Sequence, residues 1–292
     1  MTLGTSLPDP VQRLHDLVAE RYVLEDDAPA IVAGLAALTP TDVDLPPDRL
    51  AELLTTTLQQ VNGDRHLRVR HRPRGAMTTV DGAWEPRYAA NARRDAGGMH
   101  RVQRLADGIG LLEIHPVMSP IHYAAPYIAG AFALLAGCPG LIVDVRRGYG
   151  GHPDTVAYLT SFLYGTAPVH LQDMHSRLFP VRQYWTSPVG AGHTLGPDLP
   201  VCVLTSGQTF SGCEEFAYNL QALDRATIVG EQTSGGAHPS DVYRLTDVLE
   251  AHIPVARSVN AVTGTNWEGV GVTPDIGCPA AQALDRALAE LT

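Results

Sequence analysis

The stretch 200–223, "PVCVLTSGQTFSGCEEFAYNLQAL", joins an apolar run to a helix-like run through a short polar turn. The first run is uninterrupted, as expected for a strand that is buried on both faces, and the second has apolar residues at helical spacing. The same alternation of helix and strand recurs from residue 124 onwards. This pattern predicts an α/β fold with a mixed, largely parallel sheet flanked by helices.

Other segments extend this prediction in both directions. Residues 10–62 show three amphipathic helical patterns, and "HLRVRH" (66–71) alternates as a strand that His66 should begin, with His66 on its polar face. Residues 101–115 predict a hairpin about the Asp107-Gly108 turn. We therefore expect a small helical N-terminal subdomain leading into a first strand, a connector and an α/β core, over 1–71, 72–99 and 100–292 respectively.

The composition excludes several classes of partner. The formal net charge is −10 over 292 residues, and no basic cluster is longer than "RVRHRPR" (68–74), which argues against a nucleic-acid or anionic-membrane surface. The apolar stretch 123–145 contains Pro126 and Pro139, which divide it into a buried helix and a strand and argue against a membrane span. The N-terminus lacks the basic and apolar regions of a secretory signal, so we expect a cytoplasmic protein.

The basic residues and cysteines narrow the chemistry further. All 21 basic residues are arginine, so a lysine base or Schiff base is excluded. The four cysteines, Cys138, Cys202, Cys213 and Cys278, lie far apart without a C-x-x-C spacing, and we expect reduced thiols rather than disulfides or a zinc site. Neither a metal nor a cofactor is indicated by the sequence.

Ser211 has two interpretations. Ser211-Gly212-Cys213-Glu214 fits the S-x-x-E capping box, in which the serine hydroxyl and the glutamate satisfy amides at a helix start. Alternatively, a serine between a parallel strand and a helix projects its hydroxyl at the carboxyl end of the sheet, where α/β proteins bind ligands. The Gly212 amide would then face a developing oxyanion.

The other candidate residues lie in glycine-rich or turn segments. "DVRRGYGGHPDT" (144–155) predicts a βα loop in which Gly150 or Gly151 could supply a second oxyanion donor. A serine also needs a base, and the spacing alone leaves His66, His152 and His238 open. Glu268, in "NWEGVGV", is either a carboxylate that orients the base or a surface-loop residue.

Four segments together resemble the S41 peptidase family, which includes tail-specific proteases, tricorn core proteases and interphotoreceptor retinoid-binding protein modules. They occur in the family's order, and the similarity extends over about residues 60–280: "LIVDVRRGYGG", "TFSGCEEFA", "IVGEQTSGGAHP" and "TGTNWEGVGVTPDI". The helical N-terminus looks like the start of a retinoid-binding-protein-type module. The resemblance implies a ClpP/crotonase-like core.

The same resemblance implies roles for individual residues. It puts the nucleophile on Ser211, oxyanion donors on Gly212 and the Asp144–Gly151 motif, the base on His66 and its orienting carboxylate on Glu268. Arg65, His152 and His238 are possible substrate-binding residues. Two departures matter: Gly148 replaces the family's usual asparagine, and Arg65 stands where a small residue is common. The connector 72–99 is too short for a PDZ domain.

These features predict a serine hydrolase that forms an acyl-enzyme with a peptide or small acyl substrate and that could assemble as a homo-oligomer. Two alternatives stay open on sequence alone. One is a non-catalytic carrier of a retinoid, lipid or other hydrophobic ligand, and the other is a redirected ester-cleaving, acyl-transfer or cyclising enzyme. The aromatic and arginine residues of 170–200 predict a lid or an interface.

Overall fold

The computed structural model describes residues 9–79, 85–188 and 194–292, which fall into two compact units. The first, here called the N-terminal unit, combines the chain up to Pro86 with 175–180 and 238–257. The second, the core unit, is formed by 87–174, 181–237 and 258–292. The division differs from the predicted ranges 1–71, 72–99 and 100–292, because two later segments of the chain pack with the N-terminal helices.

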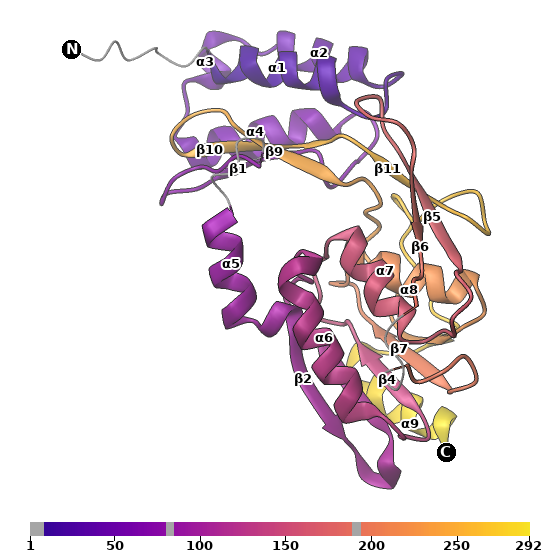
Figure 1. Ribbon diagram of the computed structural model, residues 1–292. Helices are drawn as coiled ribbons and strands as arrows, with labels where there is room; N and C mark the ends of the chain where they lie inside the picture. The colour runs from indigo at the N-terminus through magenta and orange to yellow at the C-terminus, as the bar shows by residue number, and fades with distance from the viewer. Residues whose placement is uncertain (1–8, 80–84, 189–193) are drawn as a thin grey trace. The chain divides into compact units, whose positions relative to one another are not determined.

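The N-terminal unit packs short helices against a three-stranded antiparallel sheet of order β1-β10-β9 (Figure 1). Its core consists of apolar residues from both layers, such as Leu14, Leu54 and Ile253. The helices are α1 (Pro10–Arg21), α2 (Ala28–Ala36), α3 (Pro40–Val43) and α4 (Pro47–Gln59), and the strands are β1 (Arg68–His71), β9 (Ser240–Arg244) and β10 (Leu249–Pro254). Where three helical patterns were predicted, four helices form, and the extra one is the single turn α3, which Thr39 and Asp42 cap.

The core unit contains a six-stranded sheet of order β12-β8-β7-β4-β3-β2, in which only the β2–β3 pair is antiparallel. The prediction of a mixed, largely parallel sheet is therefore confirmed. Its strands are β2 (Met99–Arg104), β3 (Gly110–Ile114), β4 (Leu141–Asp144), β7 (Val201–Thr205), β8 (Thr227–Gly230) and β12 (Ile276–Gly277). The helices of this unit include α6 (Ile121–Leu135), α7 (Pro153–Ser161), α8 (Gly212–Ala222) and α9 (Ala283–Leu291), with α5 (Glu85–Arg94) at its start. Short 3₁₀ turns are η1 (Ala96–Gly98), η2 (Ala106–Gly108) and η3 (Ala280–Gln282).

Both faces of this sheet are covered, which explains the uninterrupted apolar strands. In β4, Leu141 and Val143 join the cluster that contains residues of α6, α7 and α8, whereas Ile142 joins the cluster that contains α9 residues. Because successive side chains of a strand point to opposite faces, consecutive residues of a doubly covered strand are apolar, as 141–143 of β4 are before Asp144 ends the strand. Among the described residues, no helix is long and apolar enough to cross a membrane.

Two strands of a further three-stranded sheet lie within the predicted loop 170–200. This sheet has the order β11-β5-β6, from β5 (His170–His175), β6 (Arg182–Trp185) and β11 (Arg257–Asn260). The tip of the β5–β6 hairpin belongs to the N-terminal unit, where Arg177 donates to the carbonyl oxygen of Tyr22 at 3.2 Å and Ser176 Oγ donates to that of Val255 at 2.6 Å. Residues 189–193 of the predicted lid or interface lie outside the described residues.

Candidate active site

Ser211 lies at the junction between the turn after β7 and the first residue of α8. Its backbone has φ 53° and ψ −124°, in the region that favours glycine. An ordinary N-cap residue has extended backbone angles, so a simple helix cap does not need this conformation. Holding a non-glycine residue there costs about 1–3 kcal/mol, and such residues cluster at active sites.

The glycine-rich loop after β4 lies directly against Ser211. A Cβ atom added to Gly150 would lie 3.2 Å from the Ser211 Cβ, and one added to Gly212 would lie 2.6 Å from the backbone nitrogen and oxygen of Gly151. Gly150 also has a φ of 142°. The structure therefore brings Ser211, Gly212, Gly150 and Gly151 together, and glycine is required for this close approach.

Three backbone amides in this loop and helix start have no acceptor. Within the part of the chain that the structure describes, the N–H groups of Gly150, Gly151 and Gly212 make no hydrogen bond to the protein, although Gly150 and Gly212 are buried. Buried amides without a partner are rare in folded proteins, because each one forfeits its hydrogen bonds to water. A group of three beside one serine can donate to an oxyanion.

Cys213 explains the departure from the family at Gly148. A Cβ atom on Gly148 would lie 2.4 Å from the sulfur of Cys213, so the thiol occupies the space that an asparagine side chain would need. Cys213 is completely buried and its Sγ donates to the Gly150 carbonyl oxygen at 3.4 Å. Burial raises the pKa of Cys213 to about 12, which keeps it an unreactive thiol.

Glu214 fixes the start of α8 to the loop that follows β8. Its carboxylate is fully buried and accepts from the N–H of Ser211 at 2.7 Å, from those of Gly235 and Gly236 at 2.6 and 2.9 Å, and from the Thr233 hydroxyl at 2.5 Å. Burial raises the pKa of Glu214 despite these donors. Both halves of the predicted capping box are therefore present, and the contacts of Glu214 extend well beyond the helix.

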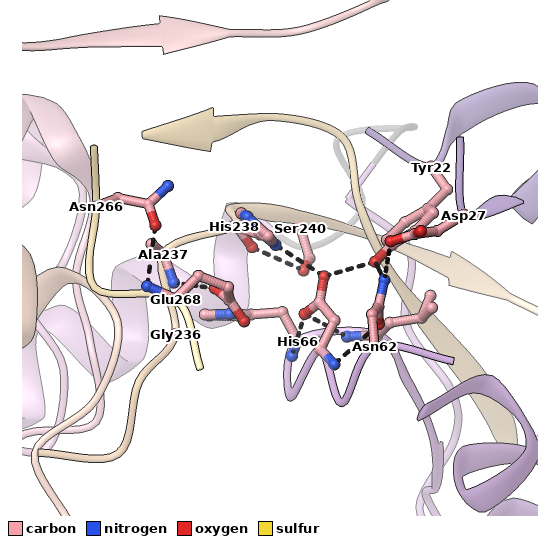
Figure 2. Close-up of polar contacts among 12 residues, drawn as sticks. Tyr22, Asp27, Asn62, His66, Gly236, Ala237, His238, Ser240, Asn266 and Glu268 are labelled. Carbon is pink, nitrogen blue, oxygen red and sulfur yellow. Dashed lines mark hydrogen bonds and ion pairs between the residues drawn. The ribbon is translucent and has the colours of Figure 1, made fainter. Parts of the chain in front are cut away.

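Glu268 is held by the same loop (Figure 2). Its Oε2 accepts from the N–H of Ala237 at 2.5 Å, and its own N–H donates to the side chain of Asn266 at 3.0 Å. The buried Trp267 donates from Nε1 to the Gly236 carbonyl oxygen at 2.8 Å. Glu268 is therefore a fixed carboxylate of the core unit rather than a mobile surface residue.

His66 belongs to the N-terminal unit, and the prediction that it begins a strand is wrong. It lies in the turn before β1, which starts at Arg68, and only 7% of it is exposed. The reason is Asp64, whose Oδ1 accepts from the N–H groups of His66 at 2.9 Å and Leu67 at 3.4 Å and so closes an Asx turn. Burial lowers the pKa of His66 to about 3, although the Asp64 charge opposes the shift.

The three possible substrate-binding residues lie in different settings. Arg65, in the N-terminal unit, is exposed. His238, in the same unit, is buried, with Nδ1 2.9 Å from Asp64 Oδ2. His152, in the core unit, precedes α7, and its Nδ1 lies 3.3 Å from an oxygen of Asp154.

Sequence reasoning did not single out Asp64 or assign Glu214 a role beyond the helix cap. Asp64 could have been found from its spacing, since an aspartate two residues before a histidine commonly accepts that residue's N–H.

Comparisons with known proteins identify the family. The model of peptidase family S41 matches residues 108–278, and that of the N-terminal domain of peptidase S41 in eukaryotic IRBP matches residues 1–92. The first match extends over more than half of the chain. The fold is that of the S41 proteases, and the chain belongs to peptidase family S41.

Solved structures share this fold at low sequence identity. A candidate peptidase from Parabacteroides merdae is 20% identical, with a TM-score of 0.65 over 98% of this chain and 97% of the other. A candidate S41 protease from Bacteroides fragilis is 12% identical, with a TM-score of 0.66 over 94% and 92%. The photosystem II D1 C-terminal processing protease is 14% identical, with a TM-score of 0.56 over 95% and 96%.

The contact between Gly148 and Cys213 predicts a specific coupling. We expect Gly148→Asn to destabilise the protein by about 1–3 kcal/mol, because the new side chain meets the Cys213 sulfur. Adding Cys213→Ala should recover part of that loss, which a double-mutant cycle from denaturant unfolding measures. Gly165→Asn is the matched control, since a Cβ there meets nothing within 4 Å. Strictly additive effects of the two substitutions would contradict this explanation.

Glu215, the next residue of α8, predicts a pH dependence of stability. It is 3% exposed, and burial raises its pKa from 4.5 to about 8, with Gln172 opposing and Asp154 adding to the shift. The folded protein therefore binds this proton more tightly than the unfolded chain, so stability falls as pH rises from 4.5 towards about 8.

Glu215→Gln should remove this dependence, whose slope for one group reaches about 1.4 kcal/mol per pH unit. Urea unfolding at about pH 5 and about pH 8 measures the difference. The exposed Glu20→Gln variant should retain the wild-type slope. If Glu215→Gln retained it as well, Glu215 would not be the group responsible.

Proposed function

We propose that this protein is a serine peptidase or a closely related acyl hydrolase with Ser211 as its nucleophile. Two observations together carry the proposal. Within the described residues, the N–H groups of Gly150, Gly151 and Gly212 have no acceptor, and they lie beside a serine whose backbone is in a conformation that favours glycine. A helix cap accounts for neither feature. Attack on an acyl carbon accounts for both, because the tetrahedral oxyanion accepts from these amides.

The proposed base is His66, and its support is chemical. A base must be neutral at the working pH, and the lowered pKa of His66 keeps its imidazole neutral from mildly acidic pH upwards. The chain has no lysine to take this role. Glu268 is the proposed orienting carboxylate, supported by its fixed position in the core unit and by the family resemblance.

The mechanism follows from these roles. His66 takes the proton from Ser211 Oγ as that oxygen bonds to the acyl carbon, and the amides of Gly212 and of Gly150 or Gly151 hold the oxyanion. Glu268 stabilises the imidazolium. The proton then passes to the leaving group, and water releases the acyl group by the same steps.

The substrate class proposed is a peptide or a related acyl compound, acted on by a cytoplasmic enzyme. Family membership supports peptide cleavage, and the proteases among the structural neighbours show the fold in such proteins. A carrier of hydrophobic ligands would have no need of an activated serine. A redirected ester-cleaving or cyclising enzyme would keep the activated serine. Comparing peptide, ester and thioester substrates therefore separates a peptidase from such a redirected enzyme.

Labelling with a serine-directed fluorophosphonate tests the proposal. We expect wild-type protein to be labelled at Ser211, Ser211→Ala not to be labelled, and His66→Ala to react about 10²–10⁴-fold more slowly because the general base is lost. Glu268→Gln should also react more slowly. Peptide mass mapping locates the adduct.

Ser187→Ala and His100→Ala, at exposed positions, are matched controls that should label at the wild-type rate. Absence of labelling in a folded wild-type protein would refute the activated serine and favour a non-catalytic carrier.

A further inference from the structure

Asp64 is a buried carboxylate with four donors in the N-terminal unit, and an Asx turn explains only half of them. It is 2% exposed. Its Oδ1 accepts from the N–H groups of His66 and Leu67, which is all that the turn requires. Its Oδ2 accepts from His238 Nδ1 at 2.9 Å and from the Tyr22 hydroxyl at 3.0 Å.

The second pair of contacts is built from buried groups. His238 is 4% exposed and Tyr22 is fully buried. Asn62 Nδ2 donates to the Tyr22 oxygen at 2.8 Å, so the phenolic hydrogen is directed to Asp64. Burial alone would raise the pKa of Asp64, but the His238 hydrogen bond and nearby imidazoles lower it. The carboxylate is thus ionised and held from both sides.

We infer that Asp64 and His238 are a positioning pair for His66: Asp64 fixes the backbone of the base and places a negative charge beside it, and His238 holds Asp64 in that orientation. The inference rests on the proposed function, in which His66 is the base. Neither residue contacts the reacting atoms in this role. In this role His238 orients Asp64 and is not a substrate-binding residue.

The charge matters because His66 is buried. Within the N-terminal unit, the charged and titratable groups acting on His66 are Asp64, which favours its protonated form, and Arg68, His238 and His252, which oppose that form. Without Asp64, an imidazole already weakened by burial would become a poorer base, and proton transfer from a serine would slow.

The test is the pH dependence of the rate of fluorophosphonate labelling at Ser211. We expect Asp64→Asn to slow labelling about tenfold or more near neutral pH. The midpoint of the acid limb should also move to lower pH, because loss of the anion lowers the pKa of His66. A purely structural loss would lower the rate without moving the midpoint.

Two variants of His238 separate its role from folding. His238→Ala removes the donor to Asp64 and should slow labelling, whereas His238→Asn retains a nitrogen where Nδ1 lies and should restore most of the rate. This pair also serves if Asp64→Asn fails to fold. Asp27→Asn is the matched control: Asp27 accepts from Asn62 at 2.7 Å but does not contact Asp64 or His66 within the described residues, so its profile should be that of wild type.

The outcomes distinguish this inference from the proposed function. If wild-type labelling depends on His66 but Asp64→Asn and His238→Ala keep the wild-type rate and midpoint, the positioning pair is refuted and the proposed function stands. If Ser211 is not labelled in folded wild type, both are refuted. If His66→Ala is labelled normally and His238→Asn is not, His238 is the base and the inference is overturned.

Discussion

The geometry around Ser211 depends on one buried carboxylate, that of Glu214. An ionisable group that is fully buried must collect donors, since its desolvation is otherwise prohibitive. Glu214 finds them in two separate segments, the N–H of Ser211 and the Thr233–Gly236 loop. It therefore sets the backbone of the serine and the path of the loop together. Ala237 follows this loop directly, and its N–H donates to Glu268. The Glu214 carboxylate therefore also fixes Glu268 indirectly.

Close backbone approach is the second constraint. Gly150, Gly151 and Gly212 leave no room for side chains, so the loop after β4 and the start of α8 contact each other through their backbones. Cys213 completes this packing at Gly148. The small thiol of Cys213 and the missing side chain at Gly148 therefore form one packing solution. It replaces the family's usual asparagine and keeps the loop in contact with Ser211.

The sheet and the glycine-lined site could be predicted from the sequence because their signals are local. Residues 141–143 of β4 are covered on both faces and are all apolar, and the order of the motifs put Ser211 beside Gly150. The alternation of polar and apolar residues could not predict that His66 lies in a turn. The Asp64 side chain accepts the His66 N–H and so closes this turn before the strand begins. Likewise, no sequence signal within 175–180 indicates that Arg177 donates a hydrogen bond to the Tyr22 carbonyl oxygen at the end of α1.

The two interpretations of Ser211 predict opposite features of the helix start. A cap exists to satisfy amides, so a capped helix should have extended backbone at the cap and few undonated N–H groups. Here the capping box of Ser211 and Glu214 is complete, yet Ser211 has a positive φ, and the N–H groups of Gly212, Gly150 and Gly151 donate to no acceptor in the described chain. Each of these features costs stability and none improves packing. Both features are explained if the acceptor for these N–H groups is a substrate oxygen that becomes negatively charged during the reaction. N–H groups that are positioned in advance for such an oxygen have no acceptor when the substrate is absent.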